Sequence, residues 1–237
     1  MNPKLKAFAV HLLVSLIIFS GLFSLLLLKW YPEPYFTASG GWQGLKIVGL
    51  VDIVLGPLLT LVVYSTKKNR KQLLADYSLI ILLQLSALAW GLYTVYQNRP
   101  VAIVWWDDRF YTVSFNSLHT QDRYAKQLRL ILNQDIPAVV IPPPSTSTEL
   151  GDIMSVFLNQ GIPPQQQLER YRPIDKTLNL IRNKAVDPPP ADSLLWLTEP
   201  QPADADKLLF FRLDSAFENL VLAISTQGKV VGYSHLP

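Results

Sequence analysis

Asp52 is the ionisable residue whose position is most unusual for its surroundings. It lies inside an apolar run, residues 48–63, with Gly49 three positions before it and Gly56 four positions after it. A carboxyl group in a membrane helix normally faces a bundle interior or a partner, and small residues let another helix approach closely. We therefore predict a binding face of Gly49, Asp52, Gly56 and Thr60. Three interpretations stay open for Asp52: a hydrogen bond within a bundle, contact with the membrane helix of another protein, and, as a smaller alternative, ion conduction.

Candidate catalytic groups outside the apolar runs are few. His119 and His235 have no second histidine or carboxylate at metal-ligand spacing, so we expect no metal site. Asp107 and Asp108 could act as paired carboxylates, but adjacent residues of a hairpin point apart, which favours a turn. The sequence has no P-loop, Gly-rich dinucleotide turn or G-x-S-x-G elbow. We expect no catalytic residues, no cofactor and no enzymatic activity.

Two arginines in the motif LERYRPIDK offer a different chemistry. Arg170 and Arg172 could clamp an anionic group. The alternatives are a solvated turn and an internal ion pair with Glu169 or Asp175. The absence of cysteine excludes thiol catalysis and disulfides.

Three apolar runs must position Asp52, and they predict membrane spans at about residues 7–28, 47–66 and 77–97. Runs of this length can cross a hydrocarbon layer of ~30 Å as helices. A cluster of basic residues follows the second run and favours the cytoplasmic side: Lys67, Lys68, Arg70 and Lys71. The prediction is a domain of residues 1–98 with a cytoplasmic N-terminus, and a domain of residues 99–237 outside the cytoplasm. A signal peptide is the competing interpretation of the first run, but its apolar core should be shorter.

Other polar or aromatic residues in the spans lie at two depths. Counting about 1.5 Å per residue from the cytoplasmic ends gives the expected neighbours. These are Ser20 and Trp90 at the level of Asp52, and Thr60 and Gln84 at the level of His11.

The connection between the first two spans is rich in aromatic residues. Residues 29–46 contain prolines, a glycine pair and the residues Trp30, Tyr31, Tyr35 and Trp42. Such side chains settle at the lipid headgroups, and Pro and Gly end helices. We predict an interfacial aromatic turn outside the membrane. The alternative is that these aromatic residues bind a partner protein.

The second part of the chain has the pattern of an α+β domain. Residues 101–106 and 109–115 flank the Asp107-Asp108 pair as a hairpin, residues 136–141 form a short strand, and the tail after residue 206 forms a meander. Helical spacing and cap residues predict helices within residues 120–134, 145–161 and 174–185, and the residues from 186 to 206 are a proline-rich connector. We predict an antiparallel sheet.

Charge separates the two parts of the chain. Residues 1–100 carry nine basic and three acidic residues, whereas residues 101–237 carry twelve and fifteen. The net charge of +3 therefore gives no reason to expect nucleic-acid binding.

Several unusual motifs occur together in residues 5–115. They are KAFAVHLLVSL, WYPEPYF followed by GGW, VDIVLGPLLTLVV, and LLQLSALAWGLYTVYQNRPVAIVWWDDRF. In these motifs the chain resembles the TfpX/TfpZ family of type IV pilin accessory proteins. The resemblance implies an inner-membrane factor with a periplasmic domain that supports a major pilin, which has a hydrophobic helix in the membrane and a head outside. The alternatives are a membrane-anchored periplasmic sensor or ligand-binding module, and a membrane enzyme using Asp107, Asp108 or His119.

Overall fold

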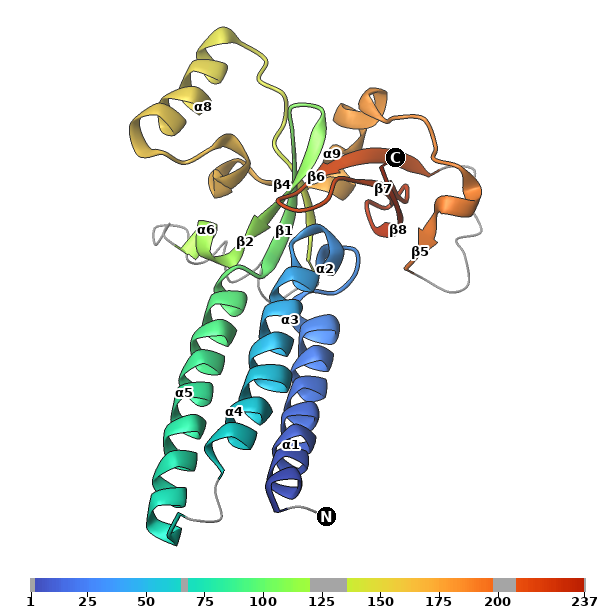
Figure 1. Cartoon of the computed structure of the whole chain (residues 1–237). Helices are drawn as coiled ribbons and strands as arrows, with labels where there is room; N and C mark the ends of the chain where they lie inside the picture. Colours follow the sequence, from blue (N-terminus) through green and yellow to red (C-terminus); the bar gives the residue numbers. More distant parts are fainter. Residues whose placement is uncertain (1–2, 65–67, 120–135, 198–207, 237) are drawn as a thin grey trace. The chain divides into compact units, whose positions relative to one another are not determined.

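Three long helices dominate the first hundred residues of the computed structural model, which describes residues 3–64, 68–119, 136–197 and 208–236 (Figure 1). They run over Pro3–Trp30, Gly41–Val63 and Arg70–Gln97, and each is long and apolar enough to cross a membrane. The three predicted apolar helices are therefore confirmed. Each begins earlier than expected, because its first residues include polar or small ones that the apolar pattern does not cover.

The chain divides into two compact units. The membrane unit comprises Met1–Pro32 and Gly40–Gln97, and the soluble unit comprises Glu33–Ser39 and Asn98–Pro237. The predicted boundary between the two parts of the chain lies between residues 98 and 99, and the units of the structure meet between Gln97 and Asn98. The prediction did not include the short segment Glu33–Ser39 in the soluble unit.

In the membrane unit α4 lies between α1 and α5 and packs against both (Figure 1). Two stretches of the first two spans are π-helical, Leu26–Trp30 and Leu50–Leu55, and Asp52 lies in the second. The sequence pattern does not distinguish these wider turns from an α-helix. The α-helical elements are α1 (Pro3–Leu25), α3 (Gly41–Gly49), α4 (Gly56–Val63) and α5 (Arg70–Gln97).

The soluble unit is built on a sheet of eight strands among the described residues, in the order β4-β3-β1-β2-β6-β7-β8-β5. β1 pairs in parallel with β3, and β2 in parallel with β6, whereas the other neighbours are antiparallel. The sheet is mixed, so the prediction of an antiparallel sheet is wrong. The strands are β1 (Pro100–Trp106), β2 (Arg109–Ser114), β3 (Ala138–Val140), β4 (Arg172–Pro173), β5 (Leu195–Trp196), β6 (Leu209–Asp214), β7 (Leu220–Ile224) and β8 (Val230–His235).

The local patterns of the sequence are well reproduced. β1 and β2 form the predicted hairpin, and Asp107 and Asp108 at its turn have φ of 50° and 67°. Two positive φ values in succession match the twist that tight hairpins need, and Asp tolerates them better than most residues. β6, β7 and β8 form the predicted meander, and β3 is the predicted short strand. The helix expected at residues 120–134 lies outside the described residues.

Helices and short segments cover both faces of the sheet. One apolar core joins alternate residues of β1, β6 and β7, and Phe110 of β2, with residues of α9. The α9 residues are Ile174, Leu178 and Ile181. A second core on other residues of β1, β2 and β3 is completed by Leu118 and Leu168. The helical elements of this unit are α2 (Tyr35–Ala38), α6 (Phe115–His119), α8 (Ser147–Gln160) and α9 (Ile174–Ile181), with 3₁₀ turns at Pro164–Gln166, Leu168–Arg170, Arg182–Lys184 and Ala191–Ser193.

Candidate functional site

The predicted face of the second span points into the membrane unit. Asp52 is 7 % exposed and Thr60 is 3 % exposed. A Cβ added at Gly49 would lie 3.4 Å from the Phe19 ring of α1, and one added at Gly56 would overlap the Gln84 amide of α5. The chain's own helices therefore cover this face on both sides.

Polar contacts connect the helices at the level of His11. Its Nδ1 lies 2.5 Å from Oγ1 of Thr60, and the Thr60 hydroxyl also lies 3.2 Å from the Gly56 carbonyl oxygen, to which it can donate. The structure thus brings His11 and Thr60 together, as the depth count predicted, and Gln84 lies one helical turn away against Gly56. These contacts link α4 to both neighbouring helices.

The two residues expected beside Asp52 are oriented differently. The Ser20 hydroxyl is exposed and donates to the Leu16 carbonyl of its own helix at 2.8 Å. Trp90 is 76 % exposed on α5. A count of depth along each helix gives the level of a residue but not the direction of its side chain, which explains the difference.

This geometry determines what the Asp52 face can do. With α1 and α5 in place, Gly49 and Gly56 are close-packing positions between helices, and Asp52 is buried beside them. The hydrogen bond of the Asp52 carboxyl within the bundle stays a prediction. Contact with the helix of another protein through this face would require α1 or α5 to move away from α4.

The aromatic residues of the first connection divide between the two units. In the membrane unit, Trp30 packs edge-on against Tyr96 at 5.1 Å between ring centroids, and the buried Tyr31 donates its hydroxyl to the Val95 carbonyl at 2.9 Å. Trp42 is half exposed. Trp30 and Tyr31 thus attach the end of the first span to α5.

Tyr35 belongs instead to the core of the soluble unit. Tyr35 is buried together with Ala38, and both pack in the apolar core of the sheet. The Ala38 carbonyl accepts hydrogen bonds from the Ser215 hydroxyl at 2.6 Å and from the Phe217 amide at 3.3 Å. Segment Glu33–Ser39 is thus an integral part of the soluble unit, although it comes from the connection between two spans.

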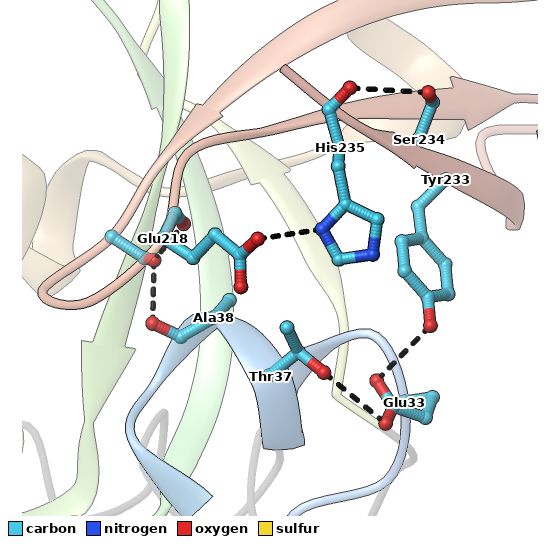
Figure 2. A network of polar contacts seen from close by, with 8 residues as sticks. Glu33, Thr37, Ala38, Glu218, Tyr233, Ser234 and His235 are labelled. Carbon is cyan, nitrogen blue, oxygen red and sulfur yellow. Dashed lines mark hydrogen bonds and ion pairs between the residues drawn. The ribbon is translucent and has the colours of Figure 1, made fainter. Parts of the chain in front are cut away.

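A polar network holds the same segment at the C-terminal strand (Figure 2). The Tyr233 and Thr37 hydroxyls each donate to the Glu33 carboxylate at 3.4 Å. His235 Nδ1 lies 2.6 Å from the Glu218 carboxylate beside them. Burial raises the pKa of the Glu33 carboxyl, and burial together with the nearby Glu33 charge raises the pKa of Tyr233 to about 12. Tyr233 therefore stays protonated and acts as the donor.

The candidate catalytic carboxylates form a turn. Asp107 and Asp108 are the central residues of the β1–β2 hairpin, and Asp108 forms a half-exposed ion pair with Lys184 at 2.8 Å. No group of three or more metal-ligating residues occurs within the described ranges. The placement of the His119 side chain lies outside the description.

The two arginines of the anion-clamp hypothesis contact their own loop. Arg170 donates its Nε hydrogen to the Gln167 side chain at 2.8 Å, and Arg172 donates to the carbonyl oxygens of Glu169 and Tyr171. All three acceptors are uncharged groups of the same loop. The bonds therefore support the alternative in which the two arginines stabilise a local turn.

Helix α8 presents an apolar surface that the sequence analysis did not identify. Ile153 is buried, whereas Leu150, Phe157 and Leu158 are exposed, the last to 78 %. The three exposed residues are spaced i, i+7 and i+8 and so share one face of the helix. We call them the α8 stripe. The same spacing was available in the sequence, but it could not show that this face of α8 is exposed rather than packed on the rest of the described unit.

Comparison with curated proteins finds fimbrial assembly proteins of Dichelobacter nodosus. The chain is 38 % identical over 109 residues to the protein of serogroup I, 46 % of this chain and 42 % of that protein. It is 37 % identical over 99 residues to that of serogroup E1, 42 % of this chain and 38 % of that protein. It is 38 % identical over 99 residues to that of serogroups C1 and C2, 42 % of this chain but 76 % of that protein. The matches thus cover about two fifths of the first two relatives. No family model and no solved structure matches.

Proposed function

Because the chain belongs to the family of fimbrial assembly proteins, we propose that it is an accessory factor of type IV pilus biogenesis that binds and stabilises a major pilin monomer. The relation to these proteins is the observation that carries the proposal. The pilin is the partner that the resemblance to pilin accessory proteins implies. No enzymatic step is part of the proposed role.

We place the protein in the inner membrane, with its N-terminus in the cytoplasm and its soluble unit in the periplasm. Three apolar helices and the basic residues after the second of them support this orientation. It puts the soluble unit on the same side of the membrane as a pilin head, while the helices share the bilayer with the pilin helix.

The α8 stripe is the surface that we assign to the pilin head. Exposed apolar residues scattered singly are normal, but three on one helical face mark a surface suited to a partner. On the membrane side, we assign Trp90 and Tyr93, the two most exposed aromatic residues of α5, to the pilin helix. The Asp52 face would then maintain the bundle.

An accessory factor that delivers a pilin monomer to the growing filament must also release that monomer. Affinity differences between related complexes lie mostly in the dissociation rate, so a contact of modest size suits this role. Three apolar side chains on one helix form such a contact, since specific and stable interfaces usually involve 20 to 30 residues on each side.

Co-purification of the major pilin with the tagged protein tests the proposal. Replacing Phe157 and Leu158 by serine should lower pilin recovery about ten-fold or more, because truncating buried anchors at an interface costs ~2 kcal/mol or more. The matched control replaces Leu180 and Leu195, which are exposed elsewhere on the soluble unit, by serine and should leave recovery unchanged.

Failure of this test has a clear form. A strain lacking the protein that keeps normal pilin levels and normal pili would contradict the accessory role as such. Equal pilin recovery with both double variants, at equal amounts of the protein itself, would contradict only the assignment of the α8 stripe.

A further inference from the structure

A groove lies between α1 and α5 in the membrane unit, on the side where the chain enters the first span. Its volume is about 650 Å³, and its floor is formed by Thr60 and Tyr64 at the end of the second span. The walls are formed by Pro3, Lys6, Ala7, Val10, His11 and Val14 of the first span and by Leu74, Tyr77, Ile80 and Ile81 of the third.

The residues that line the groove are polar toward one end and mostly apolar along the rest. Lys6 is exposed and lies in the first turn of its helix, Tyr64 directly follows α4, and Tyr77 lies about two turns inside α5. The His11 and Thr60 pair lies about 7.5 Å deeper than Lys6, at about 1.5 Å per residue. None of the described residues that line the groove is acidic. The groove therefore combines an apolar channel with a positive charge at its mouth.

The size of the groove separates two possible occupants. One turn of a helix with a diameter of ~10–12 Å and a pitch of ~5.4 Å takes up roughly 400–600 Å³. The groove thus has room for little more than one turn, whereas a membrane helix has five or six. A single hydrocarbon chain is much narrower and can follow the groove along its length.

The charge of the lining indicates which headgroup a lipid in the groove would carry. Basic pockets between membrane helices near the cytoplasmic surface bind anionic lipid headgroups. The Tyr77 hydroxyl has no hydrogen-bond partner among the described residues but is itself buried, so the exposed Lys6 ammonium is the lining group that can meet a phosphate. Nearby Lys68, in contrast, is already paired with Asp76 at 2.6 Å.

We propose that this groove binds one anionic phospholipid, with an acyl chain between α1 and α5 and its phosphate at Lys6. The lipid completes the packing of two helices that meet α4 on different sides. The inference is independent of the proposed pilin contact, which uses other residues.

Native mass spectrometry of the purified full-length protein tests this inference. The protein is delipidated in detergent and mixed with phosphatidylglycerol or with phosphatidylcholine. We expect one retained phosphatidylglycerol per protein and at least about five-fold less phosphatidylcholine. Lys6→Gln should remove most of this preference, since one basic residue near an anionic surface contributes about five-fold.

A matched pair of variants tests the position of the lipid. Val10 and Leu13 are similarly exposed on α1, but only Val10 lines the groove. Val10→Trp should fill the groove and abolish lipid retention, whereas Leu13→Trp should preserve it. Lys6→Gln changes an exposed residue, so it keeps the test valid even if Val10→Trp does not fold.

Three results would overturn the inference: unchanged lipid retention in both Val10→Trp and Lys6→Gln, equal retention of the two lipids by the unchanged protein, or loss of pilin recovery in Val10→Trp with lipid retention unaffected. The last would identify the groove as a helix-binding site. Failure of pilin binding with normal lipid retention would leave the lipid site established and reject the proposed function alone.

Discussion

Glu33 is a residue whose protonation is coupled to the docking of its segment. Burial raises the pKa of its carboxyl in the folded protein, so the folded state binds the proton more tightly than the unfolded chain does. The stability that follows from this is fully present below the ordinary pKa of glutamate and is lost as the pH rises through the raised pKa. The docked segment is therefore expected to be held more firmly in mildly acidic than in neutral solution.

The variant Glu33→Gln isolates this contribution. Glutamine keeps the shape of the side chain without its charge, so the variant should gain thermal stability over the unchanged protein at pH 7.5 and gain less at pH 4.5. Thermal unfolding followed by near-ultraviolet circular dichroism at both pH values measures the difference. Tyr233 stays protonated at both, because its pKa is about 12. A gain that is the same at the two pH values would refute the role of the Glu33 charge.

Helix α8 illustrates how far local sequence signals determine an element. Thr146 caps its start by accepting a hydrogen bond from the Glu149 amide at 3.2 Å, and Gly161 ends it with φ of 68°. Loss of such a cap costs about 1 kcal/mol. Thr146→Ala should therefore lower the free energy of unfolding by that amount, and Thr146→Ser should restore most of it. Urea denaturation measures both, and equal stability of the alanine and serine variants would contradict the cap.

Elements defined by neighbouring residues were predictable, and those defined by distant ones were not. The hairpin at Asp107 and Asp108, the meander and the ends of α8 all follow from turn and cap residues within a few positions. The parallel pairing of β1 with β3 and of β2 with β6 joins strands far apart in sequence, and no local pattern shows it. The short strand β5 lies within residues 186–206, which the sequence analysis predicted to be a proline-rich connector.

The candidate site shows the same division. The sequence identified the small, polar face around Asp52 and the shared depth of His11 and Thr60, since both follow from helical geometry. It could not show that α1 and α5 already cover that face. Nor could it show that the α8 stripe remains exposed, because exposure depends on which elements pack nearby.

At the scale of the whole molecule, the soluble unit depends on a segment from the other end of the chain. Tyr35 and Ala38 pack in its apolar core. A chain fragment of residues 98–237 lacks them and should unfold at a lower urea concentration than the same fragment carrying Glu33–Ser39 on a flexible linker. Removal of one large aromatic side chain from such a core costs about 3–5 kcal/mol. Equal midpoints for the two fragments would show that the segment contributes nothing to stability.

This arrangement also sets an order of events during synthesis. Glu33 and Tyr233 are separated by 200 positions, so Phe36 leaves the ribosome long before the strand that anchors its segment has been made. Until then the segment Glu33–Ser39 lacks the hydrogen bond from Tyr233, and a molecule whose translation stops before β8 cannot complete the network around Glu33. Synthesis of β8 is thus the step that allows Tyr233 to secure the segment through Glu33.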